Sequence, residues 1–310
     1  MTTNIVIQTS KVLTLEIDSS NIQSYLSVCD LKWRQKNLLV KSSSANNSYS
    51  FPAITRKQWL GNCLRNSWVK RVRVDRSIGE QGIRLWADTC YQANKPVYLR
   101  IPSHRNLPSC QQSTWWLIKR TLDWWAAIVL LIIASPILIS IALLIKIFTP
   151  GPIFFSQWRV GYRGRLFKIY KFRTMSVDAE QQHHQVMGKQ QGLHKQENDP
   201  RVTVIGKWLR KYSLDELPQL FNVVRGEMSL VGPRPWALYD ALRIEKANRR
   251  RLNALPGITG AWQVEARSTL LDLNAVTKCD LEYLSNWSLL RDLKILLLTV
   301  PKVVSGFGAY

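Results

Sequence analysis

One long apolar stretch interrupts an otherwise mixed pattern of hydrophobic and polar positions. It runs from Trp124 to Ile145 (WWAAIVLLIIASPILISIALLI) and contains no charged residue. At about 1.5 Å per residue, a helix of these 22 residues reaches about 33 Å, enough to cross a hydrocarbon core of ~30 Å. The pattern therefore predicts a membrane-embedded helix.

Basic residues flank this run on both sides, and a Ser135-Pro136 step lies near its middle. The flanking cations are Lys119 and Arg120 before the run and Lys146, Arg159, Arg163, Arg165, Lys168, Lys171 and Arg173 after it. By the positive-inside rule, both ends are expected on the cytoplasmic side. Proline removes a helical hydrogen bond, and serine can satisfy part of the freed backbone. We therefore predict a bent, re-entrant helix; a straight span with a proline kink and a buried core helix are the alternatives.

The first 111 residues contain no comparable run and predict a small soluble α/β domain. Residues 69–75 and 96–102 alternate like strands, and residues 80–93 between them place apolar side chains at helical spacing. This order predicts a right-handed β-α-β unit. Residues 12–17 predict a further strand, and residues 41–50 a polar loop. The segment shows neither a phosphate-binding glycine pattern nor a catalytic cluster, so its role stays open, with an interaction or regulatory role favoured.

After the apolar run, short strand and helix patterns alternate with glycine and proline breaks. The segment from Leu289 to Val304 is apolar but contains Arg291, Asp292, Lys294 and Lys302. It is too short and too charged to span a bilayer, so it predicts a buried or interface-lying helix. Residues 176–200 are rich in Gln and His, and their spacing favours a solvated segment over a metal site.

The charge balance narrows the class of partner. The chain of 310 residues carries 43 Lys and Arg against 21 Asp and Glu, a net charge of +22. Such a balance favours an anionic partner, and the apolar run places lipid headgroups and phosphorylated substrates above nucleic acid. The 13 tryptophans include pairs at 115–116 and 124–125, typical of headgroup depth. Five scattered cysteines suggest neither a disulfide framework nor a zinc site, and the N-terminus has no signal-peptide pattern.

The densest polar constellation spans residues 210–235 (RKYSLDELPQLFNVVRGEMSLVGPRP). Ser213 and Glu216 fit a capping box at a helix start, which alone could explain the acidic pair Asp215 and Glu216. The same helix start presents free backbone N–H groups, and the nearby Arg210 and Arg234 suit phosphate oxygens. A carboxylate in such a place can form a phospho-aspartyl intermediate while its neighbour helps to hold a metal ion. Residue spacing leaves both interpretations open.

A series of motifs in the same order resembles the bacterial sugar transferase family, the monotopic polyprenyl-phosphate phosphoglycosyl transferases. The resemblance covers about Lys119 to the C-terminus. It rests on K-R-x-x-D at 119–123, the Ser135-Pro136 break, GPIFFSQWRVG at 151–161, KFRTM at 171–175, DPRVTVIG at 199–206, LDELPQL at 214–220, GEMSLVGPRP at 226–235, PGITGAWQV at 256–264 and the 280–296 segment. The catalytic motifs show no departure from the family pattern.

The resemblance implies a two-step reaction on the cytoplasmic face of the bacterial inner membrane. Asp215 would attack the β-phosphate of a UDP-sugar and release UMP; polyprenyl (undecaprenyl) phosphate would then accept the sugar phosphate, the first membrane step of exopolysaccharide synthesis. Glu216 would assist, with Mg²⁺ shared by Asp215, Glu216 and Asp292. Phosphate contacts would come from Arg210, Arg234, Arg267, Lys171 and Arg173, each with a structural alternative.

The combined expectation is an α+β, monotopic membrane enzyme. A soluble α/β domain (1–111) precedes a membrane anchor (112–149) with the Ser135-Pro136 break, and a sugar-phosphate transferase domain (150–310) with interfacial helices follows. A homo-oligomer stays open. An inactive, membrane-tethered scaffold of polysaccharide assembly is the main alternative, and a basic nucleic-acid-binding protein is a distant one suggested by the net charge alone.

Overall fold

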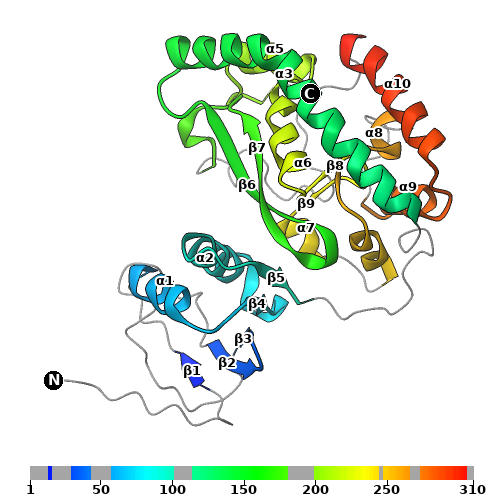
Figure 1. Ribbon diagram of the computed structural model, residues 1–310. Coiled ribbons are helices and arrows are strands. Elements are labelled where there is room, and N and C mark those ends of the chain that lie inside the picture. Colours follow the sequence, from blue (N-terminus) through cyan, green and yellow to red (C-terminus); the bar gives the residue numbers. More distant parts are fainter. Residues whose placement is uncertain are drawn as a thin grey trace. The chain divides into compact units, whose positions relative to one another are not determined.

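The computed structural model describes residues 13–15, 29–42, 57–100, 114–180, 199–243, 247–265 and 273–305. The chain divides into two compact units. The first comprises residues 1–103 with the short segments 163–166 and 238–243; the second comprises 104–162, 167–237 and 244–310. Both helices and sheets contribute, as an α+β class requires (Figure 1).

A five-stranded sheet forms the centre of the first unit. Its strands are β1 (Leu13–Leu15), β2 (Cys29–Arg34), β3 (Asn37–Ser42), β4 (Arg71–Val74) and β5 (Val97–Leu99), in the order β1-β2-β3-β4-β5. Strands β1 to β3 pair antiparallel, whereas β3-β4 and β4-β5 are parallel. The parallel pairs require crossovers, which α1 (Lys57–Asn66) and α2 (Gly79–Gln92) provide.

The β-α-β unit predicted from the sequence is confirmed. Val72 and Val74 of β4 are buried, while Arg71 and Arg73, which alternate with them, are exposed. Helix α2 buries the apolar stripe Ile83, Trp86, Ala87 and Cys90 that the spacing predicts. The strand predicted at 12–17 is present over Leu13–Leu15. The predicted polar loop at 41–50 begins as the last two residues of β3, and its remainder lies outside the described residues.

Helix α3 (Thr114–Phe148) contains the apolar run and is 35 residues long. It is the one described helix long and apolar enough to cross a membrane, with a mean hydropathy of 3.1 over its most apolar window. Only 11% of that window is buried, which excludes the buried core helix considered above. Pro136 lies inside the helix, and Figure 1 shows α3 as two arms that run in different directions.

After α3, two small sheets form the framework of the second unit. Strand β6 (Phe154–Val160) lies between β7 (Leu166–Phe172) and β9 (Trp236–Ala237), and β8 (Ser229–Val231) pairs parallel with β10 (Gly257–Thr259). The short helices of the second unit are η4 (Val177–Glu180), α5 (Val204–Lys211), η5 (Leu214–Gln219), α6 (Leu220–Val224), η6 (Ala247–Asn253) and α8 (Ala261–Glu265). Helix α7 (Leu238–Arg243) and most of η3 (Tyr162–Gly164) belong to the segments that group with the first unit. Helices α9 (Leu273–Ser285) and α10 (Leu289–Ser305) complete the described part.

Two apolar clusters of the second unit each take residues from a different arm of α3. Ala127 belongs to a cluster with Phe167 and Ile169 of β7. Ile141 and Ile145 belong to a second cluster, with Phe172 of the same strand and Leu209 of α5. Strand β7 therefore provides the apolar support for both arms.

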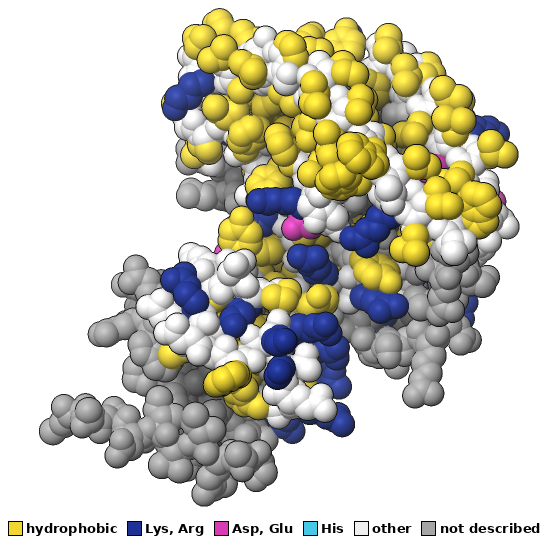
Figure 2. Space-filling model, in the orientation of Figure 1, with side chains coloured by type: hydrophobic (Ala, Val, Ile, Leu, Met, Phe, Trp, Pro, Cys, Tyr) yellow, Lys and Arg dark blue, Asp and Glu magenta, His cyan; other side chains and the backbone are white. Residues whose placement is uncertain are grey.

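Large apolar side chains remain exposed over one face of the second unit. They come from the middle of α3 and from α10, where Leu290, Leu297 and Val304 are more than half exposed. Figure 2 shows these side chains as a broad hydrophobic surface on the second unit. The exposed apolar side of α10 favours the interface-lying form of the helix predicted at 289–304.

Candidate functional site

A sharp turn between α5 and η5 presents the acidic pair. Thr203 caps α5 by accepting a hydrogen bond from the Gly206 amide (3.0 Å), and a Cβ at Gly206 would lie 2.0 Å from the Thr174 carbonyl oxygen. Only glycine permits this close approach of α5 to the chain that follows β7. Ser213, with φ of 52°, then turns the chain into η5, which begins with Leu214, Asp215 and Glu216.

The capping box considered from the sequence is wrong. Ser213 adopts a left-handed conformation instead of the extended one that a side-chain N-cap needs, and its side chain makes no capping hydrogen bond. The turn is a 3₁₀ helix containing Pro218. The Glu216 carboxylate is bound by Lys171, so the acidic pair has a purpose other than capping.

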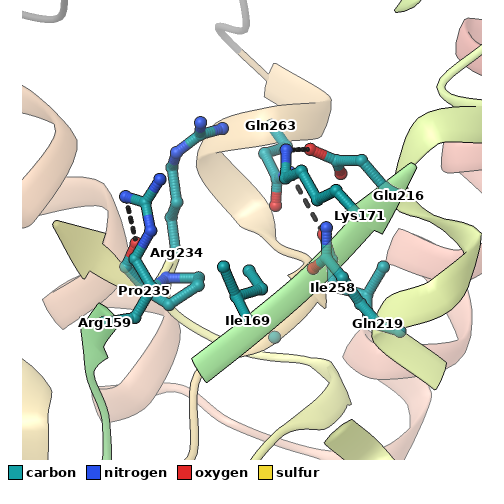
Figure 3. Close-up of a pocket in the computed structure, with 10 residues that line it drawn as sticks. Arg159, Ile169, Lys171, Glu216, Gln219, Arg234, Pro235, Ile258 and Gln263 are labelled. Carbon is teal, nitrogen blue, oxygen red and sulfur yellow. Dashed lines mark hydrogen bonds and ion pairs between the residues drawn. The ribbon is translucent and has the colours of Figure 1, made fainter. Parts of the chain in front are cut away.

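Lys171, from β7, lies against both carboxylates. Its ammonium Nζ donates to Glu216 Oε1 at 2.5 Å and lies 3.8 Å from Asp215 Oδ2 (Figure 3). The Lys171 and Glu216 side chains are each about one fifth exposed, whereas the whole Asp215 residue is only 8% exposed. One cation therefore serves two carboxylates, and the more buried carboxylate has the longer contact.

Burial dominates the electrostatics of Asp215. Desolvation raises the pKa of this carboxyl to about 6; the negative charge of Glu216 adds to the rise, and Lys171 and Arg210 oppose it. Arg210 approaches from α5, where its Nε donates to Thr174 Oγ1 at 2.9 Å. Burial lowers the pKa of Arg210, while Asp215 and Asp199 act in the opposite direction. The charge of Asp215 is thus incompletely balanced by its surroundings.

An open pocket lies beside this pair. The lining residues are Arg159, Ile169, Lys171, Glu216, Gln219, Arg234, Pro235, Gly257, Ile258 and Gln263. Figure 3 shows Arg159 and Arg234 on one side and the Lys171–Glu216 pair on the other. Two guanidinium groups facing a carboxylate–ammonium pair suit an anionic ligand that carries phosphate.

A buried cation holds the main chain at Arg234. Arg251 is 2% exposed, and its Nη2 donates to the Arg234 carbonyl oxygen at 2.8 Å. It also forms an ion pair with Asp280 and stacks on Trp236, 3.6 Å from the ring centroid. The Arg234 guanidinium itself lies 5.4 Å from the Trp262 ring centroid. These contacts fix where the Arg234 side chain leaves the backbone.

The second unit matches a known family over most of its length. The sequence profile described as Bacterial sugar transferase matches residues 114–306. The chain belongs to this family. The galactosyl transferase CpsE of Streptococcus agalactiae is 44% identical over 199 residues, 62% of this chain and 43% of that protein. The exopolysaccharide production protein ExoY of Rhizobium meliloti is 40% identical over 204 residues, 63% of this chain and 88% of that protein.

A third relative carries a more specific name. The UDP-glucose:undecaprenyl-phosphate glucose-1-phosphate transferase of Caulobacter vibrioides is 43% identical over 202 residues, 63% of this chain and 72% of that protein. The chain spans less than half of CpsE but most of ExoY. All pocket-lining residues and the acidic pair lie within the matched 114–306 segment, whereas the five-stranded unit lies mostly outside it.

Several pocket residues were not assigned a role from the sequence of this bacterial sugar transferase. Arg159, Gln219, Gln263, Ile169 and Ile258 line the pocket. Each falls inside or next to a motif of the family, but motif order gives no indication of which side chains face a common space. The signal available in the sequence was the presence of the polar residues Arg159, Gln219 and Gln263 within motifs of the family.

Arg173 and Arg267 were two of the predicted phosphate-binding residues. Arg173 donates to the carbonyl oxygens of Pro150 (2.5 Å) and Thr149 (3.1 Å) and to the Thr149 hydroxyl (2.7 Å), so it holds the chain just after α3. These bonds use both terminal nitrogens of Arg173 and favour the structural alternative that the sequence left open for it. Arg267 lies outside the described residues.

Asp292 was predicted to share a metal ion with Asp215 and Glu216. The part of the chain that the structure describes contains no group of three or more His, Cys, Asp or Glu side chains placed to hold one metal ion, so Asp292 does not join Asp215 and Glu216. Its oxygens accept from the Tyr283 hydroxyl (2.6 Å) and Trp287 Nε1 (3.1 Å), and Lys119 lies 2.8 Å away. This carboxylate is committed to joining α3, α9 and α10.

Proposed function

We propose that the protein transfers a sugar 1-phosphate from a UDP-sugar to undecaprenyl phosphate, giving undecaprenyl-diphosphate sugar and UMP. Membership of the sugar transferase family supports this reaction, as do relatives named as UDP-glucose and galactose transferases of this type. The observation that carries it is the buried Asp215 carboxylate beside a pocket with Arg159 and Arg234.

The first step uses Asp215 as a nucleophile. A carboxylate oxygen forms a bond to the β-phosphorus of the UDP-sugar, the bond from that phosphorus to the oxygen bridging to the α-phosphate breaks, and UMP leaves with that oxygen. In the second step an oxygen of undecaprenyl phosphate attacks the same phosphorus. The acyl-phosphate bond breaks and the Asp215 carboxylate is restored.

Neighbouring side chains prepare Asp215 for this role. A carboxylate that is buried and only partly paired is a better nucleophile than one held in a short ion pair, and Lys171 makes its short contact with Glu216 instead. Lys171 then stays close enough to stabilise charge on the transferred phosphoryl group. We assign Arg210, Arg234 and Arg159 to the donor phosphates because guanidinium geometry matches phosphate oxygens.

Mg²⁺ fits this acidic pair only together with substrate. Magnesium is usually bound through one or two carboxylates plus substrate phosphates, and Asp215 and Glu216 provide two carboxylates without a third. Bound there, the ion would offset negative charge on the phosphates. Glu216 would exchange its contact with Lys171 for the metal, leaving Lys171 for a phosphate oxygen.

The packing of α3 supports a re-entrant anchor. Ala127 lies in a cluster with Ile169, and Ile141 in a cluster with Phe172, three residues further along β7. Three strand residues span about 10 Å, whereas the 14 helical residues from Ala127 to Ile141 would span about 21 Å if straight. A straight span would also place its ends on opposite sides of the bilayer, away from one shared strand.

A re-entrant anchor would place both ends of α3 at one membrane surface. The pocket then lies at headgroup depth, where the phosphate of a polyprenyl chain is found while its tail stays in lipid. The exposed Arg120 and Lys146, on either side of the apolar run of α3, favour the anionic cytoplasmic leaflet. We therefore propose a monotopic protein on the cytoplasmic face of the bacterial inner membrane.

UMP release in nanodiscs tests the reaction directly. The full chain would be supplied with Mg²⁺, undecaprenyl phosphate and a panel of UDP-sugars that begins with UDP-glucose and UDP-galactose, and Asp215→Asn would be run beside it. Release that depends on one donor and disappears in the variant supports the proposal. Release that is unchanged in a folded Asp215→Asn protein contradicts it, and no release with any donor favours the inactive scaffold.

A further inference from the structure

One end of the five-stranded sheet combines exposed tryptophans with exposed cations. Trp33 and Arg34 end β2, Lys36 lies in the turn to β3, and Trp68, Lys70 and Arg71 lead into β4. The Lys70 and Arg71 amides both donate to the Lys36 carbonyl oxygen, at 2.8 and 3.3 Å, so the two chain segments are adjacent. We call these six residues the Trp-basic end.

Its tryptophans are unusual for a soluble surface. Trp68 is 90% exposed and Trp33 is 51% exposed, whereas Trp86 of the same unit is buried in the core. Trp and Tyr concentrate at membrane headgroups, where one side of the ring is apolar and the other wet. Two exposed tryptophans among four cations match the composition of a membrane-interface surface.

The register of the sheet extends the positive charge beyond this end. Arg34 pairs with Asn37 and Asn37 with Arg71; in the next outward-facing row, Lys32 pairs with Leu39 and Leu39 with Arg73. Paired residues point to the same face. The chain passes from β3 to β4 and from β4 to β5 in the same direction across the sheet. Because such crossovers are right-handed, α1 and α2 lie on one face of the sheet, opposite the face that carries these cations. The cationic face is therefore free of these helices. Trp33 pairs with the buried Leu38 and so points to the other face, which means that the Trp-basic end is defined by the edge where the strands end and not by one face.

Among the residues that the structure describes in this unit, two ion pairs lie away from the Trp-basic end. Arg84 pairs with Glu80, and Arg100 with Asp75, at the opposite end of β4. The Trp-basic end consists of tryptophans and cations without a carboxylate among its six members. This charge is complementary to a surface of lipid phosphates.

Chain connectivity keeps the unit close to such a surface. Arg100, just after β5, is 14 residues from Thr114, where α3 begins. Even fully extended at about 3.5 Å per residue, that connection reaches about 50 Å. A tether of this length gives a high effective concentration of bilayer around the unit.

We propose that the Trp-basic end docks on the anionic lipid surface around the α3 anchor, with Trp33 and Trp68 at headgroup depth and the four cations against lipid phosphates. The inference rests on the membrane anchoring proposed above, but not on the transfer reaction. Docking would hold the N-terminal unit at the membrane beside the enzyme that it precedes in the chain.

Lysine footprinting of the full chain tests this docking. The protein is placed in nanodiscs of phosphatidylcholine alone or with phosphatidylglycerol, treated with an amine-acylating reagent and analysed by mass spectrometry. Acylation of Lys36 and Lys70 should be slowed about fivefold in the anionic discs, and about 0.5 M NaCl should reverse the effect. Lys41, at the opposite end of β3, is the internal control and should change little.

Variants separate lipid contact from altered folding. Trp68→Ala, and Arg34→Ser combined with Arg71→Ser, should each restore fast acylation in anionic discs. Arg76→Ser, which removes an arginine beyond the far end of β4, is the matched control and should keep the slowing. Lipid-dependent UMP release by each variant in detergent verifies that the catalytic unit is intact, and near-UV circular dichroism verifies folding.

Three results would overturn the proposal. These are equal acylation rates in both kinds of disc, slowing that the variants do not abolish, and slowing produced in phosphatidylcholine discs by RNA or an acidic protein but not by anionic lipid. Asp215→Asn should keep the footprint, so a failed transfer reaction and a failed docking are distinguishable. A chain that does not co-purify with the discs would refute the anchor and this docking together.

Discussion

The second unit contains two clusters in which one lysine contacts two carboxylates. Lys171 lies beside Asp215 and Glu216, and Lys119 lies between Asp123 and Asp292. In the first cluster the carboxylates follow one another on a 3₁₀ turn beside an open pocket. In the second they come from α3 and α10, and the lysine is 3% exposed. Equal residue types thus occupy very different surroundings.

Hydrogen-bond completion distinguishes the two clusters. Asp123 also accepts from the Ser229 hydroxyl, and Asp292 from Tyr283 and Trp287. Asp215 instead has a 3.8 Å ion-pair contact with Lys171. Asp292 uses both carboxylate oxygens and Asp123 accepts two short hydrogen bonds on Oδ2, so both stabilise packing, whereas the longer contact leaves Asp215 available for chemistry. A reactive carboxylate is therefore recognised by how weakly its charge is paired as well as by its residue type.

The largest expected effect is on transfer. Asp215→Asn removes the nucleophile and should lower UMP release by about three orders of magnitude or more, with membrane association retained. Asp292→Asn is the matched acid-to-amide change in the other cluster. The folded fraction of this variant should keep most of its specific activity. Equal losses in both folded variants would contradict the distinction between the clusters.

For stability, we expect a larger loss from the Lys119 cluster than from the Lys171 cluster. Lys119→Met leaves two buried carboxylates facing each other and should lower the free energy of unfolding by about 3 kcal/mol or more. Lys171→Met leaves a pair of carboxylates of which Glu216 lines the open pocket, so it should cost less stability, although it should impair transfer. Thermal unfolding in detergent measures both, and a smaller loss for Lys119→Met than for Lys171→Met would show that the assignment is reversed.

The same arginine-to-lysine change should have different effects in the pocket and at the chain end after α3. Arg234→Lys keeps the charge but loses the bidentate fork, and should raise KM for the UDP-sugar or lower kcat/KM by about 10-fold. Arg173→Lys is the matched change at the end of α3, where three bonds to Thr149 and Pro150 are lost. It should lower Tm and leave donor KM unchanged; a shift of donor KM equal to that of Arg234→Lys would place Arg173 in the site after all.

A pH series provides a second contrast with Asp215. Arg201 binds both oxygens of Asp199, at 2.8 and 2.6 Å, and these hydrogen bonds hold the pKa of Asp199 below its usual value. A depressed folded-state pKa contributes stability above the unfolded-state value and loses it as the pH falls through the folded one. Asp199→Asn should cost about 1–3 kcal/mol at pH 7, and the difference from wild type should shrink below about pH 4. A difference that does not depend on pH would contradict this pairing.

The smallest predicted effect has the opposite sign. Because the folded-state pKa of Asp215 is raised to about 6, ionisation at pH 7 disfavours the folded state. Asp215→Asn should therefore raise Tm by a few degrees in EDTA, equivalent to about 1 kcal/mol. Differential scanning fluorimetry in detergent measures the shift. A lowered Tm would mean that the Asp215 carboxylate stabilises the fold.

Sequence patterns predicted those features that depend on local order. The apolar run became α3, the β-α-β spacing became β4-α2-β5, and the motif order placed the chain in its family. The pairings of Arg173 with Thr149 and of Asp292 with Lys119 could not be predicted, because they join segments that only folding brings together. The capping box failed for a local reason: Ser213 adopts a left-handed conformation that the motif cannot reveal.

The covalent intermediate is the most direct test of the central claim. Purified chain would be incubated with Mg²⁺ and the UDP-sugar found in the panel, without undecaprenyl phosphate, then digested and analysed by mass spectrometry. A hexose-phosphate mass on the peptide containing Asp215, formed together with an equal amount of UMP and removed on adding undecaprenyl phosphate, is the predicted result. UMP formed only when both substrates are present, with no adduct on Asp215, would contradict it.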